Sequence, residues 1–262
     1  MDFSDMEYYQ FIKKVKIKIG IDLSLYKENQ MKRRLTSFRD KKNFSNFTDF
    51  FKAIEKDEQL YTEFLEKITI NISEFFRNAQ RWKILEDKII PIILKSTNKK
   101  SLKCWSAACS TGEEPYTLSM ILNDSFPNIS CEILATDLDE SALKKAQEGI
   151  YAERLLREMP LTYKEKYFKE ENKLFHINSA IKKNVKFMKK DLLIDKFDNN
   201  FDLIICRNVV IYFTEEAKHV LFKKISDALN PGGVLFVGST EQVFNSNLHN
   251  LNMIDNFFYQ KY

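Results

Sequence analysis

Apolar residues recur at helical spacing through the first 70 residues of the chain. The first run predicts a helix that ends near Gly20, a residue suited to a C-cap. Its apolar positions are Tyr8, Phe11, Ile12, Val15 and Ile19. Ser24 is the expected N-cap of a second helix that runs to about Asp40. Two further helices are expected. One follows Ser45 and Phe47 and runs through Phe50, Phe51 and Ile54, and the other begins at about Gln59 and runs through Tyr61, Phe64, Leu65 and Ile68. This part of the chain therefore predicts a small helical domain, residues 1–70.

Residues 70–78 have no clear period, and by pattern alone they form a linker. Phe75 and Phe76 are its expected anchors. Three of its polar side chains could point to one side of a loop or helix start, namely Asn71, Ser73 and Arg77. A helix follows from Ala79 to Leu94, interrupted by Pro91.

From residue 101 onward, apolar runs of strand length alternate with helical patterns. The expected strands are 101–105, 131–136, 185–188, 201–206, 234–238 and a terminal strand at 253–260. The expected helices are Ser141–Gly149 and Thr214–Asn230, the second closed by Pro231, Gly232 and Gly233. Residues 151–184 break the rhythm and predict a small appended subdomain. The pattern indicates an α/β domain over 71–262, with a doubly wound seven-stranded sheet whose last hairpin is antiparallel.

The turn after the first strand, in residues 104–116, lies where such sheets bind ligands. Only Gly112 is glycine there and GxGxxG is absent, so a diphosphate lacks its usual backbone cradle. Glu113 and Glu114 would repel phosphate but would favour a cationic, phosphate-free nucleoside such as S-adenosylmethionine. Asp137, at the end of the second strand, is placed to hold a ribose diol. An ordinary turn with an acidic helix start remains the alternative.

Composition narrows the class of protein. The 262 residues are 44% hydrophobic and 30% charged, as in a globular protein that folds. The N-terminus lacks the pattern of a signal peptide and no apolar run reaches about 20 residues, so we expect a cytoplasmic protein without membrane insertion. Four scattered cysteines and three separated histidines match no metal-binding spacing, so no metal is expected.

Positive charge is concentrated in the predicted helical domain. Residues 10–42 contain 11 Lys and Arg against 3 Asp and Glu, a net charge of +8, whereas the whole chain carries +4. A basic helical domain implies an acidic partner, either nucleic acid or an acidic protein surface. A solvated surface without a partner is the alternative.

Five segments together resemble the chemotaxis receptor methyltransferases of bacteria, the CheR family. They are NISEFFRN, WSAACSTGEEPYTL, ATDLDESALKKAQEGIY, FDLIICRNVVIYF and LNPGGVLFVGSTE. The resemblance runs from the helical domain almost to the C-terminus. It implies a class I methyltransferase with a Rossmann-like sheet and a β-subdomain insertion. The implied activity is S-adenosylmethionine-dependent O-methylation of receptor glutamates to γ-glutamyl methyl esters, with S-adenosyl-L-homocysteine as product.

The resemblance also implies individual site residues, which lie in the predicted linker, at the turn after the first strand and at the ends of later strands. Those matching the family's cofactor-binding positions are Asn71, Ser73, Arg77, Glu113, Glu114, Asp137, Asp191, Leu192, Arg207 and Asn208. Ser73 stands where Thr is common and Asp191 where Asn is frequent. Which of Glu113 and Glu114 contacts the cofactor is left open. Tyr212 is the residue implied near the transferring methyl group, and Arg77 and Tyr212 are the candidate catalytic residues.

The implied partners are methyl-accepting chemotaxis receptors, whose cytoplasmic helical bundle would meet the basic helical domain. Nucleic acid is then not a partner. Some family members also grip a receptor C-terminal pentapeptide with the β-subdomain. Residues 168–185 contain no glycine for a tight turn, so we expect no such tether here. Two other classes stay open: a nucleic-acid methyltransferase, and a cofactor-binding signalling module without catalysis.

Overall fold

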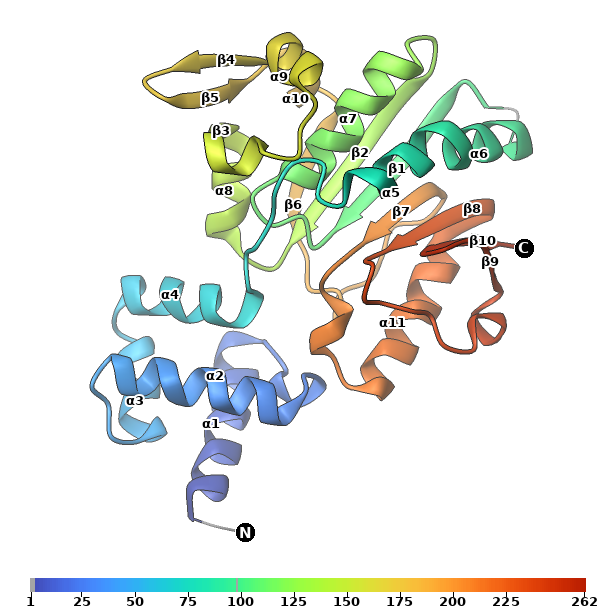
Figure 1. Ribbon diagram of the computed structural model, residues 1–262. Coiled ribbons are helices and arrows are strands. Elements are labelled where there is room, and N and C mark those ends of the chain that lie inside the picture. Colours follow the sequence, from blue (N-terminus) through green and yellow to red (C-terminus); the bar gives the residue numbers. More distant parts are fainter. Residues whose placement is uncertain (1–2, 98) are drawn as a thin grey trace. The chain divides into compact units, whose positions relative to one another are not determined.

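The computed structural model describes residues 3–97 and 99–262 and divides the chain into two compact units. One unit comprises Met1–Ile70 with Tyr212–His219, and the other comprises Asn71–Ile211 with Val220–Tyr262. Figure 1 shows helices in the first unit and a helix-covered sheet in the second. No helix among the described residues is long and apolar enough to cross a membrane.

The first unit is built around aromatic side chains from consecutive helices. Its helices are α1 (Phe3–Ile19), α2 (Glu28–Lys41), α3 (Phe47–Ile54) and α4 (Glu58–Thr69). The Phe11 ring lies 4.8 Å from that of Phe47 and 6.0 Å from that of Phe64, centroid to centroid. Such edge and tilted pairs stabilise a core beyond their buried area. The helical pattern of the sequence thus reflects a real apolar core.

A short later segment completes this unit through backbone hydrogen bonds. The Lys27 N–H donates to the Tyr212 carbonyl (2.8 Å), and the Thr214 N–H donates to the Leu25 carbonyl (2.9 Å). These bonds join residues almost 190 positions apart, which no local pattern could indicate.

The expected capping role of Ser24 is wrong. Ser24 lies inside a 3₁₀ turn, Leu23–Leu25, whose cap is Asp22. The Asp22 carboxylate accepts both the Ser24 N–H (3.1 Å) and its hydroxyl (2.5 Å), so the serine is not available to start a helix. Consequently α2 begins four residues later, at Glu28.

The second unit contains a seven-stranded sheet with the order β6-β2-β1-β7-β8-β10-β9. Its strands are β1 (Ser101–Ala107), β2 (Ser130–Asp137), β6 (Val185–Lys189), β7 (Phe201–Cys206), β8 (Leu229–Val237), β9 (Leu251–Asp255) and β10 (Phe258–Lys261). All neighbours from β6 to β8 pair in parallel, whereas β10 is antiparallel to β8 and β9. This confirms the predicted seven-stranded α/β sheet with an antiparallel final hairpin.

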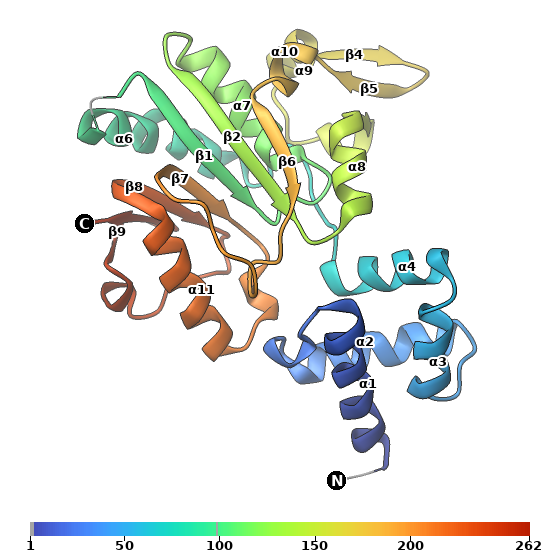
Figure 2. The same ribbon diagram turned by 180° about the vertical axis from the view of Figure 1, so that it is seen from behind.

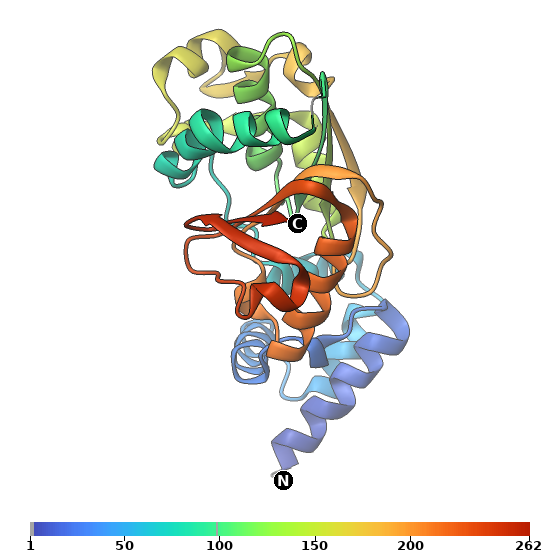
Figure 3. The same ribbon diagram turned by 90° about the vertical axis from the view of Figure 1, so that its right-hand side faces the viewer.

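Two expectations at the C-terminal end of the sheet are wrong. The stretch 253–260 is not one strand but the two strands β9 and β10, joined at a turn where Phe257 has φ +73° (Figure 3). The strand β8 begins at Leu229, not at residue 234, and the preceding helix ends at Ala228. The first error arises because apolar alternation continues through a tight turn without marking it, and the second because Pro231, Gly232 and Gly233 were interpreted as the end of the helix although they lie within β8.

Helices cover both faces of the sheet (Figures 1 and 2). They are α5 (Ala79–Ile84), α6 (Ile90–Thr97), α7 (Glu113–Ser125) and α8 (Glu140–Glu148), with α11 (Glu215–Ala228) on the opposite face. A π-helical turn, Leu85–Ile89, joins α5 to α6, and the Ile90 N–H donates to the Leu85 carbonyl. Pro91 follows directly. The hydrogen-bond register of the helix thus changes just before the residue that lacks an N–H, and the helix continues past Pro91.

The insertion after α8 forms its own three-stranded sheet, with the order β3-β5-β4. Its elements are β3 (Ile150–Ala152), a 3₁₀ turn (Glu153–Leu156), α9 (Leu161–Tyr167), β4 (Phe168–Glu171), β5 (Leu174–Ile177) and α10 (Ser179–Lys182). Asn172 and Lys173 make the hairpin turn with φ of +52° and +63°. The expectation that a tight turn here needs glycine is therefore wrong, because two non-glycine residues adopt the left-handed region.

Candidate functional site

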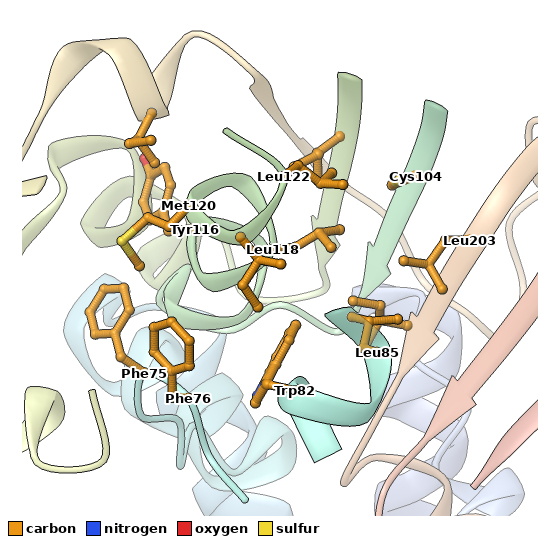
Figure 4. Packing of buried hydrophobic residues seen from close by; sticks show 14 of the residues in the cluster. Phe75, Phe76, Trp82, Leu85, Cys104, Tyr116, Leu118, Met120, Leu122 and Leu203 are labelled. Atoms are coloured by element: carbon orange, nitrogen blue, oxygen red, sulfur yellow. The ribbon is translucent and has the colours of Figure 1, made fainter. Parts of the chain in front are cut away.

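The segment before α5 is held in place by tertiary contacts at its two phenylalanines. The Phe75 N–H donates to the Leu155 carbonyl (2.9 Å), and the Phe76 N–H donates to the Thr117 hydroxyl (3.2 Å). Both rings are buried, and Figure 4 shows them side by side next to Met120 of α7. Residues 71–78 are thus a fixed segment of the sheet domain, and not the linker that the pattern alone suggested.

Asn71 connects two loops at the carboxyl ends of neighbouring strands. Its amide donates to the Asp139 carboxylate (2.6 Å), and its carbonyl accepts the Ser110 hydroxyl (3.1 Å). Asp139 in turn caps α8 by accepting the N–H groups of Ser141 and Ala142. The predicted cofactor residue Asn71 therefore holds the loops after β1 and β2 together.

The loop from β1 to α7 has an unusual backbone. Ala108, Ser110 and Gly112 all have positive φ, of +63°, +49° and +93°. A side chain at Gly112 would place its Cβ 2.8 Å from the Ala146 Cβ, so glycine is required there for space as well as for conformation. Non-glycine residues in this region are strained and persist only where surrounding contacts hold them, as they commonly do at binding sites.

The two acids at the start of α7 have different partners. Glu113 is fully buried and accepts the Thr111 hydroxyl at 2.8 Å on both carboxylate oxygens. Burial raises the pKa of Glu113, while hydrogen bonds from its own backbone, Thr111 and Ser73 oppose that shift. Glu114 accepts the Ser106 hydroxyl (2.8 Å) and lies 3.4 Å from the Arg207 guanidinium. Glu113 is therefore held by the loop after β1, whereas Glu114 is held by Ser106 of β1 and by Arg207 at the end of β7.

Asp137 ends β2 with both carboxylate oxygens on backbone groups. One oxygen accepts the Ser110 N–H (2.8 Å) and the other the Asp139 N–H (2.9 Å). Burial raises the pKa of Asp137 to about 6, although these N–H groups favour the ionised form. Each carboxylate oxygen can accept more than one hydrogen bond, so the group can still receive two hydroxyls.

Arg207 lies at the end of β7 and is almost completely buried. Its guanidinium donates to the Arg77 carbonyl (2.9 Å), the Asn78 side chain (3.1 Å) and Glu114 (3.4 Å). Burial lowers the pKa of Arg207, while the Glu114 carboxylate opposes the shift. The two terminal nitrogens of the guanidinium are thus bonded to protein groups and fix the end of the segment 71–78, whereas the buried Nε has no hydrogen-bond partner among the described residues.

Glu241 is a site residue that sequence reasoning did not single out. It is buried, and its carboxylate accepts the N–H groups of Asn208 (2.6 Å), Val210 (2.9 Å) and Gly238 (2.8 Å). Burial raises its pKa, and these N–H groups lower it. The only sequence signal was its place in the GSTE motif, whereas its role in fixing Asn208 follows from the fold.

The remaining predicted residues divide into two groups. Asp191 accepts the Leu193 N–H (2.8 Å) in the loop after β6, beside the buried Leu192, and Arg77 donates to the Ile72 carbonyl (3.1 Å). Tyr212, in contrast, belongs to the helical unit, where its ring lies 5.4 Å from the Arg34 guanidinium. Its role at the transferring methyl group stays a prediction.

The site combines fixed acids, backbone N–H groups and a strained turn at the carboxyl ends of β1, β2 and β7. Within the described residues, no group of three or more His, Cys, Asp or Glu side chains could hold a metal ion. Buried carboxylates next to polar backbone suit a ligand that carries positive charge and hydroxyl groups. Together with the strand order, this arrangement defines a class I methyltransferase fold.

Comparison with known proteins identifies the family. A model described as "CheR methyltransferase, SAM binding domain" matches residues 71–257, and one described as "CheR methyltransferase, all-alpha domain" matches residues 6–69. The chain belongs to the CheR methyltransferase family.

Several curated relatives cover nearly the whole chain. The "Chemotaxis protein methyltransferase" of Listeria innocua is 45% identical over 257 residues, 98% of each chain. The protein of the same name from Listeria monocytogenes is 44% identical over the same share. That from Borreliella burgdorferi is 38% identical and covers 90% of this chain and 88% of the relative.

Proposed function

We propose that this protein transfers a methyl group from S-adenosylmethionine to glutamate side chains of methyl-accepting chemotaxis receptors, forming γ-glutamyl methyl esters. The observation that carries the proposal is the full-length match to chemotaxis protein methyltransferases, with both family domains in order. The proposed substrate is the receptor's cytoplasmic helical bundle, so the proposed compartment is the cytoplasm.

The residues of the sheet domain fit this cofactor. Asp137, with acceptor capacity left on both oxygens, would hold the ribose hydroxyls, as the sequence predicted. Asn71, Ser73, Glu113 and the loop after β6 would complete the pocket. The cofactor supplies the electrophilic methyl group. The protein's own contribution is to place the acceptor and to exclude water.

The acceptor needs no general base in this reaction. A glutamate side chain has a pKa near 4.3, so at neutral pH it is already a carboxylate nucleophile. The rate then depends on in-line approach at about 3–3.5 Å, which is a matter of positioning. Because both reactants lose charge, a cation bound tightly to the carboxylate would stabilise the ground state. The proposed role of Arg77 is therefore to orient the acceptor and not to activate it.

A basic groove in the helical unit supports docking on an acidic helix. Its volume is about 630 Å³, and its lining residues are Gln30, Arg33, Arg34, Ser37, Phe38, Lys41, Lys67 and Tyr212. Six of these lie along one face of α2, a length of about 16 Å at 1.5 Å per residue. No lining residue in the described structure is acidic. An acidic receptor helix fits this length and charge.

Reversing charge in this groove should slow receptor methylation. The Arg34 guanidinium donates to the Lys67 carbonyl (3.2 Å) and Lys32 lies over the Tyr8 ring, so neither is a clean probe. Arg33 and Lys41 are exposed. The double variant Arg33→Glu, Lys41→Glu should lower kcat/KM for receptor about tenfold at low ionic strength, with weaker salt dependence. Cofactor affinity should not change.

The control for this prediction is a second double reversal with the same charge change. Lys13→Glu with Lys18→Glu alters exposed positions of α1 outside the groove. It should retain the wild-type rate and salt dependence. If both double variants behave alike, docking through the groove is wrong and the effect is one of net charge.

The proposed activity is tested with tritiated methyl donor and two acceptors. Receptor-containing membranes should gain label that mild base releases as methanol, and receptors with alanine at the methylated glutamates should not. Label on RNA instead would support a nucleic-acid methyltransferase. Cofactor binding without transfer to either acceptor would support a signalling module without catalysis.

We also expect no pentapeptide tether, although glycine content no longer supports this. One of the two edge strands of the small sheet, β4, carries exposed Lys169, Glu170 and Glu171, and charges on an edge strand disfavour addition of another strand. Calorimetric titration with a receptor C-terminal pentapeptide of the tryptophan–phenylalanine type should give no heat of binding. A micromolar Kd would contradict this expectation.

A further inference from the structure

Tyr151 connects the insertion to the turn after β1. It lies in β3 and its side chain is buried, with 3% of its surface exposed. Its hydroxyl donates to the Thr111 carbonyl at 2.9 Å. The bond spans 40 positions of sequence and reaches into the strained turn 108–112.

The group that Tyr151 holds is the one that orients Glu113. Thr111 stands between Ser110 and Gly112, both with positive φ, so its own backbone orientation depends on outside contacts. Its hydroxyl donates to both oxygens of the Glu113 carboxylate at 2.8 Å. A shift of the Thr111 backbone would therefore move the hydroxyl that fixes a predicted cofactor residue.

The same tyrosine also contacts the other cofactor segment. Its ring packs edge-on against Phe75, with centroids 4.8 Å apart. A few residues further on, the Leu155 carbonyl accepts the Phe75 N–H (2.9 Å). The first elements of the insertion thus support both the turn 108–112 and the segment 71–78.

We propose that Tyr151 is a positioning residue for S-adenosylmethionine, so that the insertion forms part of the support of the cofactor site. The inference rests on the proposed function. Tyr151 acts through Thr111 and Phe75 and need not touch the cofactor. Its hydroxyl stabilises the left-handed turn in the form that presents Glu113.

The test is Tyr151→Phe, which removes only the hydroxyl. Loss of one hydrogen bond should raise the Kd for S-adenosylhomocysteine and the KM for S-adenosylmethionine about three- to tenfold. At saturating cofactor, kcat should stay within about twofold, because the acceptor contacts are unchanged. Unchanged Kd and KM, or a loss confined to kcat, would overturn the proposal.

Tyr167→Phe is the matched control. Tyr167 is also a buried tyrosine of the insertion, and its hydroxyl accepts the Asn123 amide (3.0 Å), away from the turn. Tyr167→Phe should leave the Kd for S-adenosylhomocysteine and the KM for S-adenosylmethionine at wild-type values. If both variants weaken S-adenosylhomocysteine binding equally, a general loss of stability of the insertion explains the effect, and the specific role of Tyr151 is wrong.

A measurement on the wild-type protein makes the test independent of the variants. Binding of S-adenosylhomocysteine should slow hydrogen exchange both in residues 108–113 and in residues 150–156. Protection of the first segment alone would overturn the proposal. Failure of the wild-type protein to bind S-adenosylhomocysteine would instead contradict the proposed function.

Discussion

Replacing Arg207 by methionine should lower the free energy of unfolding of the sheet domain by about 3–5 kcal/mol, the usual effect of removing one partner of a buried ion pair. Arg207 and Glu114 are both largely buried, and their side chains are 3.4 Å apart. Without the guanidinium, the Glu114 carboxylate loses the cation with which it is paired, and the Arg77 carbonyl and the Asn78 side chain lose a donor. Urea denaturation measures the loss.

Two companion variants separate the ion pair from side-chain size. Arg207→Met with Glu114→Gln should recover part of the loss, because no uncompensated charge remains. Arg157→Met alters an exposed arginine and should change stability by less than about 0.5 kcal/mol. A loss below about 1 kcal/mol for Arg207→Met would contradict the importance assigned to this pair.

Asp137→Ala should weaken S-adenosylmethionine binding by about 1.5–3 kcal/mol, the range for hydrogen bonds to a charged group. This corresponds to roughly a ten- to 150-fold rise in Kd. The carboxylate is the predicted ribose ligand and also holds the Ser110 and Asp139 N–H groups. Calorimetry on a variant with an intact circular dichroism spectrum measures the effect, and an unchanged Kd would refute the assignment.

The raised pKa of Asp137 adds a dependence on pH. Since the ionised carboxylate accepts the hydroxyls, affinity should fall as pH drops through about 6, the pKa in the free protein. In Asp137→Asn this decline should be absent. Stability moves in the opposite direction: a pKa raised above that of the unfolded chain makes the free protein less stable as pH rises from about 4 through 6. Asp137→Asn should lack that component too.

Local sequence patterns predicted the elements that carry the site. The helices of the first 70 residues and the parallel strands follow from apolar periods, since burial of one face selects for a repeat of 3.6 or 2 residues. Periodicity did not separate β9 from β10, because alternation passes through their turn unchanged. It also missed the two-residue turn at Asn172 and Lys173, which reaches positive φ without glycine.

The placement of predicted site residues depended more on motif resemblance than on pattern. By pattern alone Asn71 was a linker residue, and only the motif predicted a role at the cofactor. Its hydrogen bonds reach Asp139 and Ser110, which are 68 and 39 positions away in the sequence. No period reports such a contact. Glu241 and Tyr151 each end a segment that resembles the family, but the sequence did not predict a role for either residue.

The fold class, the family and most of the helices and strands could thus be predicted from the sequence, because they depend on local periods and on motifs that can be read in one dimension. Only the tertiary structure decided which polar groups meet: Glu114 with Arg207, Thr111 with Tyr151, and Asn208 with Glu241. Buried polar groups must find partners wherever the packed chain brings them. Their pairing is therefore a property of the fold and not of neighbouring residues in the sequence.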